Sequence, residues 1–241
     1  MMRGNIHLKK ETGIYLIITY LIFQLIIPSF SSEKASVSVP FTNSLVNIDG
    51  ILDKNEWDKS ISIELKDING GSNYKYRTVV SILRDSDYIY IAYKCFDDKS
   101  KDTIRNAKYR DDAVWSDDSI EFFLKPDIDD NKYYHFAVSA SGAQYDGLGF
   151  DAKWSVYWIA KTHIYDDYWT VEAAIPFSSL GISCNIKAND NWTGNFHRSV
   201  RPHTNQYEIT GWSPCMGNFH NPGIFGELKG MLVNSSSYKI S

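Results

Sequence analysis

The sequence predicts an all-β protein, folded as a two-sheet antiparallel β-sandwich of the jelly-roll kind. After residue 32, apolar residues come in short runs rich in β-branched and aromatic side chains. Loops rich in Asp, Asn and Gly separate these runs, and no segment keeps the 3.6-residue period of a long helix. About eight to eleven strands at this spacing are typical of two sheets that bury alternate faces against each other.

The clearest local pattern is a hairpin in the first half of the chain. Residues 77–85 and 88–98 alternate as strands and are separated by a Ser-Asp turn. Further strands are expected within residues 119–127, 133–142, 168–181 and 191–202. Pro176 should end its strand, and residues 177–182 should form one short helical turn.

The composition indicates one domain with a large hydrophobic core. It also has enough aromatic residues for some to form a surface site. Hydrophobic residues make up 43% of the 241-residue chain and aromatic residues 15%. The formal net charge is -4, and 25 basic residues are interspersed with 29 acidic ones, so no basic footprint for nucleic acid is present. We therefore expect no nucleic-acid partner.

The N-terminus is predicted to be an export signal. Arg3, Lys9 and Lys10 precede the apolar run 14–27, which is shorter than the ~20 residues that span a bilayer. Small residues follow it, so cleavage is expected near Ser31, with an uncleaved N-terminal anchor as the alternative. The protein would then be secreted, periplasmic or at the cell surface. The domain plan is signal peptide or anchor 1–31, N-terminal extension 32–44, β-sandwich domain 45–232 and disordered tail 233–241.

Residues that bind metals and cofactors form no recognisable pattern. The cysteines Cys95, Cys184 and Cys215 are odd in number and scattered, so we expect small buried apolar residues instead of a disulfide framework. No haem or nucleotide is expected. The histidines fall on different predicted elements without ligand spacing: His135, His163, His197, His203 and His220. Calcium could use the acidic loops 96–102 and 125–131, but neither follows an EF-hand spacing, so we favour solvated surface loops.

The stretch "DDAVWSDDSIEFFLKPD", residues 111–127, sets a tryptophan and acidic residues directly before a strand. Sugars present apolar C–H faces ringed by hydroxyl groups, so a sugar site needs an aromatic platform with polar groups beside it. Trp115 and Glu121 supply both kinds. The alternative is that Trp115 caps the core and Glu121 is a solvated strand residue. A glycosidase would need two carboxylates on opposite sides of a cleft. Asp117 and Asp118 belong to one stretch, and nothing in the sequence marks a second carboxylate opposite them.

Several motifs together resemble the family 9 carbohydrate-binding modules, which share a structural class with DOMON-like sandwiches. In chain order they are "VNIDGILDKNEWDKS", "LRDSDYIYIAYKCFD", "WSDDSIEFFLKPD", "YHFAVSASGAQYDG", "YWTVEAAIPFSSLG" and "WSPCMGNFHNPGIFGELKG". Their order and spacing carry the resemblance, which covers roughly residues 45 to 230. In the first motif, Gly50 should make a tight turn and Trp57 should be buried in the first strand region.

The resemblance implies a non-catalytic protein that binds a poly- or oligosaccharide. Trp115 would stack on the sugar and Glu121 would hydrogen-bond its hydroxyl groups. The second platform of the family falls on Phe219 in "NFHNPGIFGEL", with Trp212 as an alternative and with Asn218 or His220 as added donors.

One departure from the family pattern concerns the strand after the glutamate motif. Ala137 stands where reducing-end binders carry an arginine, so reducing-end recognition is not implied. His197 and Arg198 are substitute donors, or else make structural hydrogen bonds at a sheet edge. The resemblance also implies structural calcium, a monomer, and a glycoside hydrolase or cell-surface complex as partner. The competing functions are a glycoside-acting enzyme domain and a DOMON-type haem or protein-interaction domain.

Overall fold

The computed structural model describes residues 34–126, 132–182, 191–201 and 207–231. Residues 1–33 form a separate unit outside these ranges, so the predicted export signal is not described. No helix among the described residues is long and apolar enough to cross a membrane. Everything below concerns the second unit, which starts at Lys34.

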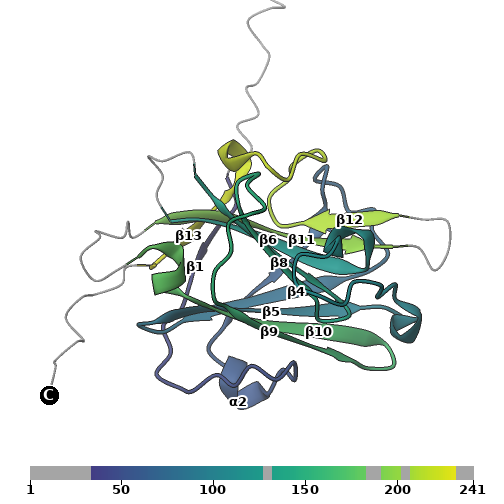
Figure 1. Cartoon of the computed structure of the whole chain (residues 1–241), viewed down its shortest axis with the longest axis horizontal. Coiled ribbons are helices and arrows are strands. Elements are labelled where there is room, and N and C mark those ends of the chain that lie inside the picture. Colours follow the sequence, from purple (N-terminus) through teal and green to yellow (C-terminus); the bar gives the residue numbers. More distant parts are fainter. Residues whose placement is uncertain (1–33, 127–131, 183–190, 202–206, 232–241) are drawn as a thin grey trace, which may run out of the picture. The chain divides into compact units, whose positions relative to one another are not determined.

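Two β-sheets lie one against the other, which confirms the predicted sandwich (Figure 1). We call the larger one the front sheet; its order is β1 (Ser36–Ser38), β13 (Gly226–Lys229), β11 (Trp192–Val200), β6 (Ser119–Lys125), β7 (Tyr134–Ser139) and β8 (Gln144–Leu148). Strand β12 (Glu208–Gly211) also pairs with β11, and with β3 (Lys66–Asp67). The back sheet has the order β2 (Ile61–Glu64), β4 (Thr78–Arg84), β5 (Tyr88–Phe96), β10 (Tyr168–Pro176) and β9 (Ile159–Ile164).

The pairing is antiparallel except between β1 and β13, which run parallel. The helical segments are short: α2 (Lys54–Trp57) and the 3₁₀ turns η1 (Ser100–Asp102), η2 (Val114–Ser116), η3 (Phe177–Leu180) and η4 (Pro222–Ile224). The predicted hairpin is β4–β5, Pro176 ends β10, and η3 is the expected helical turn. The sandwich begins before residue 45, because β1 lies in the segment expected to be an extension.

Period-2 alternation decides which side chains enter the core. On β6, Ile120, Phe122 and Leu124 are fully buried between the sheets, so Glu121 and Phe123 lie on the outer face of the front sheet. The same alternation on the neighbouring strands sends Phe136 and Phe196 inward. Hence one outer sheet face collects every second residue of β6, β7 and β11.

The opening motif is fixed to the back sheet by one buried carboxylate. Glu172 on β10 accepts hydrogen bonds from the backbone N–H of Gly50 (2.8 Å) and from the indole Nε1–H of Trp57 (2.8 Å). Gly50 adopts φ 90°, and an added Cβ would lie 2.8 Å from the backbone carbon of Thr162, so this turn requires glycine. Trp57 is buried as predicted, but it ends helix α2, because Asp53 caps a helical turn where a strand was expected.

Two of the three cysteines are described. Cys95 and Cys215 are both buried free thiols, as expected for small apolar residues. Cys184 lies outside the described ranges.

Trp57→Phe should destabilise the domain, because it keeps a buried ring but removes the N–H that Glu172 accepts. Losing one partner of a buried carboxylate costs about 1–3 kcal/mol. Urea unfolding followed by circular dichroism measures the loss, with Trp115→Phe as the control because its ring is 44% exposed. Equal stability of the two variants would contradict the role given to Glu172.

Candidate functional site

Asp117 holds a loop on the outer face of the front sheet. Its fully buried carboxylate accepts the backbone N–H groups of Asn106 and Ala107, at 2.9 Å each. The hydroxyl of Ser139 on β7 donates to the same carboxylate at 2.7 Å. With its oxygens engaged in this way, Asp117 ties the 104–107 segment to the sheet and is not free to act as an acid or base.

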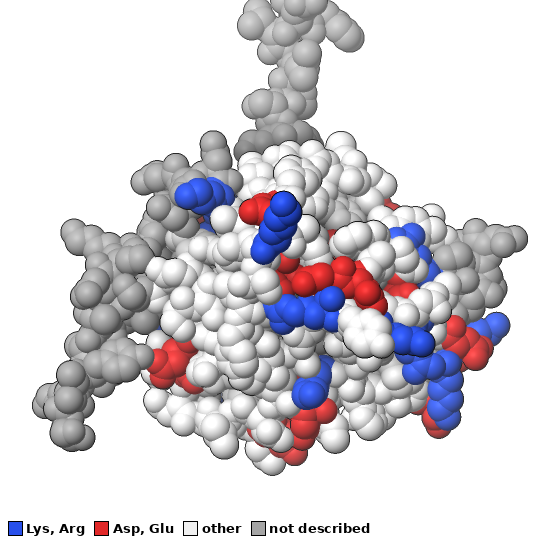
Figure 2. All heavy atoms as spheres, viewed as in Figure 1, with Lys and Arg blue, Asp and Glu red and all other residues white. Residues whose placement is uncertain are grey.

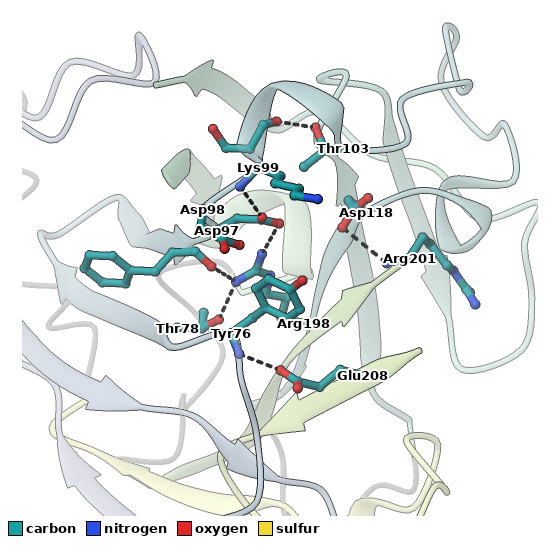
Figure 3. Close-up of polar contacts among 12 residues, drawn as sticks. Tyr76, Thr78, Asp97, Asp98, Lys99, Thr103, Asp118, Arg198, Arg201 and Glu208 are labelled. Carbon is teal, nitrogen blue, oxygen red and sulfur yellow. Dashed lines mark hydrogen bonds and ion pairs between the residues drawn. The ribbon is translucent and has the colours of Figure 1, made fainter. Parts of the chain in front are cut away.

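Asp118 has the same kind of role. Its buried carboxylate accepts the backbone N–H of Ile104 at 2.8 Å and that of Arg201 at 3.2 Å (Figure 3). The guanidinium of Arg201 in turn donates to the carbonyl oxygen of Trp115. The two aspartates that follow Trp115 in the sequence therefore fix the backbone around it.

Trp115 projects from η2 at the edge of the front sheet. Val114 before it is fully buried, whereas the Trp115 side chain is 44% exposed. Its ring meets the edge of the Tyr145 ring, with 5.4 Å between centroids and 85° between planes. The sequence left open whether Trp115 caps the core, and the structure places it at the surface with Tyr145 supporting it.

Glu121 lies beside this aromatic pair, on the outer face of β6. It is 6% exposed, and one carboxylate oxygen is 2.9 Å from Nε2 of His135 on β7. Burial raises the pKa of Glu121, but the hydrogen bond and charge of His135 outweigh it and leave the pKa below its usual range. Glu121 is therefore an ionised acceptor at neutral pH.

These residues line a pocket of about 270 Å³ on the outer face of the front sheet. Its lining residues are Trp115, Glu121, His135, Tyr145, Gly149, Phe150 and His220. Phe150 is 79% exposed, and its ring stacks on His220 with 4.4 Å between centroids and 20° between planes. The pocket thus combines exposed rings with one buried carboxylate.

Histidines converge here although their sequence spacing indicated no constellation. His135 and His220 have ring centroids 5.0 Å apart, and His197 lies opposite Glu121 in the β11–β6 register. Strand pairing thus brings together histidines that lie far apart in the chain. Among the described residues, no group of three or more His, Cys, Asp or Glu is placed to hold a metal ion.

Burial keeps two of these histidines uncharged. It lowers the pKa of His197 to about 4, and it lowers that of His220 to about 4 with a further contribution from His135. Nδ1 of His220 lies 2.9 Å from the hydroxyl of Tyr133, which orients the ring under Phe150.

Phe219, expected as the second platform, is not among the residues that line this pocket. Its ring covers His197, with 4.2 Å between centroids and 11° between planes, and it packs against the cluster around Phe123. The next residue, His220, reaches the pocket instead. Asn218, suggested as an added donor, is exposed and does not line the pocket either.

Trp212, the alternative platform, packs against the core. Its ring lies 5.6 Å from that of Phe196, and an added Cβ at Gly226 would come within 2.5 Å of it. This contact explains why position 226 in "FGEL" is a glycine. It also shows that the Trp212 ring packs inside the protein instead of forming a sugar platform.

Arg198, suggested as a donor from β11, faces the sandwich interior and is fully buried (Figure 3). It donates to the carbonyl of Phe96 at 2.9 Å and lies 3.5 Å from a carboxylate oxygen of Asp97. Because β11 alternates, Arg198 and His197 point to opposite faces, so Arg198 cannot share a site with Glu121. Its contacts are those of a structural residue.

Calcium remains a prediction from the resemblance. In the loop 96–102, Asp97 accepts the backbone N–H of Lys99 at 2.9 Å and faces Arg198, which leaves it poorly suited as a ligand. Residues 127–131 of the second acidic loop lie outside the described ranges.

Sequence analysis missed Phe150, Tyr145 and His135 as pocket residues. A signal existed for two of them: Phe136 and Val138 mark the inward face of β7, so His135 must face outward, and Tyr145 pairs with Ala137 on the same face. Phe150 has no such signal, because it lies in the tight turn after β8, where Asp151 N–H bonds the Leu148 carbonyl.

Fold and site together define a two-sheet β-sandwich with an aromatic-lined pocket on the outer face of one sheet. The family described as "Carbohydrate family 9 binding domain-like" matches residues 48–232. The chain therefore belongs to this family, as its motifs predicted. No curated protein matches the sequence.

Solved structures show the same fold at low identity. A family 9 carbohydrate-binding module from Caldicellulosiruptor kristjanssonii in complex with glucose is 19% identical, with a TM-score of 0.62 over 80% of this chain and 94% of that one. A putative carbohydrate-binding protein from Bacteroides uniformis is 21% identical, with a TM-score of 0.63 over 81% and 98%. The C. kristjanssonii module in complex with cellotriose is 19% identical, with a TM-score of 0.60 over 82% and 93%.

The buried His197 should make the domain less stable in mild acid. The pKa of His197 in the folded chain is about 4, below the usual 6.5. Between these two pH values the unfolded chain binds a proton at His197 and the folded chain does not. The free energy of unfolding should fall as the pH drops from about 6.5 to 4, by about 3 kcal/mol from this residue. His197→Gln should flatten that slope in denaturant titrations at a series of pH values. His163→Gln, at an exposed histidine of β9, is the control, and unchanged slopes in both variants would contradict the account.

Proposed function

We propose that this protein is an exported, non-catalytic module that binds one unit of a poly- or oligosaccharide in the pocket beside Trp115. The observation that carries the proposal is the joint presence of an exposed tryptophan face and a buried carboxylate in one pocket. The ring covers the apolar C–H face of a sugar, while the carboxylate accepts its hydroxyl hydrogens. Family membership and solved relatives that hold glucose and cellotriose support it.

The carboxylates argue for binding without hydrolysis. A glycosidase needs a second carboxyl group about 5 to 9.5 Å from the first, and one of the pair with a raised pKa. Glu121 is the one carboxylate among the lining residues, and its pKa is lowered. Asp117 and Asp118 are occupied by backbone N–H groups. We therefore place the module beside a separate activity, such as a glycoside hydrolase or a cell-surface complex for polysaccharide breakdown or uptake.

Surface charge fits a sugar partner better than nucleic acid. In the face that Figure 2 shows, acidic and basic side chains are interspersed, and no broad field of positive charge extends across it. Export rests on the sequence of residues 1–31, and N-terminal sequencing of the secreted chain tests it: a start near Ser32 supports cleavage, and a retained Met1 contradicts it.

Trp115→Ala should weaken glycan binding at least about tenfold without unfolding the domain. Losing the stacked face costs about 1.4 kcal/mol or more, while an exposed ring adds little to the core. Calorimetry against glycans chosen from an array screen measures the affinity. Tyr157→Ala is a matched control, because Tyr157 is 66% exposed and does not line the pocket. Equal affinity of the two variants, or unfolding of Trp115→Ala, would contradict the proposal that Trp115 stacks on the sugar.

The second wall of the pocket should be Phe150 supported by His220, not Phe219. Phe150→Ala is expected to weaken binding several-fold at unchanged stability, because its exposed ring stacks in the pocket lining. Phe219→Ala should chiefly lower the unfolding free energy, since its ring covers His197 and packs near Phe123. Calorimetry and denaturant unfolding of both variants separate the two roles. The reverse pattern would restore Phe219 as the platform.

A further inference from the structure

The pocket combines several aromatic rings with one carboxylate, that of Glu121 paired with His135, and its lining has no lysine or arginine. Trp115, Tyr145, Phe150 and His220 supply the rings, and Glu121 supplies the carboxylate. Aromatic faces carry negative partial charge and attract cations, and a carboxylate within such a group of rings strengthens that attraction.

Only one of the two oxygens of the Glu121 carboxylate is hydrogen-bonded to a described residue. One oxygen takes the hydrogen bond with His135, and the other makes no hydrogen bond to a described residue. The neighbours of Glu121 in the strand register are Ala137 on β7 and His197 on β11. Neither competes for the free oxygen with a positive charge, because His197 is held neutral by burial. The second oxygen of this largely buried side chain is thus left for a ligand.

Other carboxylates act on Tyr145, which lines the pocket. Burial raises the pKa of Tyr145, and the nearby charges of Asp111, Asp146, Glu121 and Asp151 raise it further. Arg110, which approaches this region, is held by Asp146 and by the carbonyl oxygen of Val156 at 2.7 Å. Because the lining has a carboxylate and no lysine or arginine, it favours a cationic ligand over an anionic one.

We propose that the pocket prefers a sugar unit carrying a protonated amine, with the ammonium group against Glu121 and the aromatic rings around it. An amino sugar keeps the apolar ring face that Trp115 covers, and it replaces a hydroxyl hydrogen bond to Glu121 by a charge-assisted one. A uronic acid would instead set a carboxylate against Glu121. This inference rests on the proposed function and names the class of sugar that the same pocket selects.

Calorimetry with three tetrasaccharides of one linkage tests the preference. They are cellotetraose, its 2-amino-2-deoxy counterpart and the N-acetylated form of the latter, so that only the group at C2 changes. At about pH 5.5 the sugar amines are protonated, and Glu121 is ionised because its pKa is held below the usual range of a glutamate. The amine form should bind at least about tenfold more tightly than the other two.

Two variants locate the source of the preference. Glu121→Gln keeps the shape of the side chain and should abolish the preference for the amine. Asp111→Asn is the matched control: Asp111 lies outside the pocket lining at φ 66°, which asparagine tolerates, so the preference should largely persist. Thermal unfolding of each variant shows whether it is folded.

The outcomes separate this inference from the proposed function. Equal or weaker binding of the amine form, with cellotetraose binding that Trp115→Ala weakens, overturns the inference and leaves the function standing. An amine preference that survives in Glu121→Gln also overturns it, because general surface charge would then be the cause. Binding of none of these sugars, nor of any array glycan, overturns both.

Discussion

Asp117 and Asp118 hold segment 104–107 beside the pocket, where Ala107 packs with Val114 and Tyr145. Their carboxylates are fully buried and accept backbone N–H groups from Ile104, Asn106 and Ala107. A buried charge is stable only when hydrogen bonds satisfy it, so loop and strand fix each other in position. Without this tie the segment that carries Trp115 would have no defined place above the sheet. The acidic residues of this motif therefore stabilise the loop. They contribute to binding indirectly, by fixing the backbone around Trp115.

The sheet supplies the rest of the site by alternation. Because Ile120 and Phe122 point into the core, Glu121 must point out, and its position on the central strand β6 surrounds it with β7 and β11. His135 then fixes the carboxylate, and the loops that follow β8 and β12 bring Phe150 and His220 above it. A rigid sheet with rings at its rim is a preorganised site, which lowers the entropy lost when a sugar binds.

Much of the fold could be predicted from the sequence because its signals are local. The alternation of β4 and β5, the strand end at Pro176 and the buried Trp57 all follow from a few neighbouring residues. The site was harder, because it depends on pairing between distant strands and on tight turns. Trp115 and Glu121 were suggested by the aromatic and acidic stretch 111–127 and by the resemblance, whereas Phe150 depends on the turn after β8. Arg198 follows His197 directly, yet faces the opposite side of the sheet.

The seven tryptophans of the chain provide a direct test of where the sugar binds. Each indole N–H gives its own signal in a ¹H–¹⁵N correlation spectrum, and single Trp→Phe variants assign Trp57, Trp115 and Trp212. On titration with a bound glycan, the Trp115 signal should shift, while that of Trp57, held by Glu172, should stay in place. A glycan that binds without moving the Trp115 signal, or that moves the signal of Trp212 instead, would contradict the account.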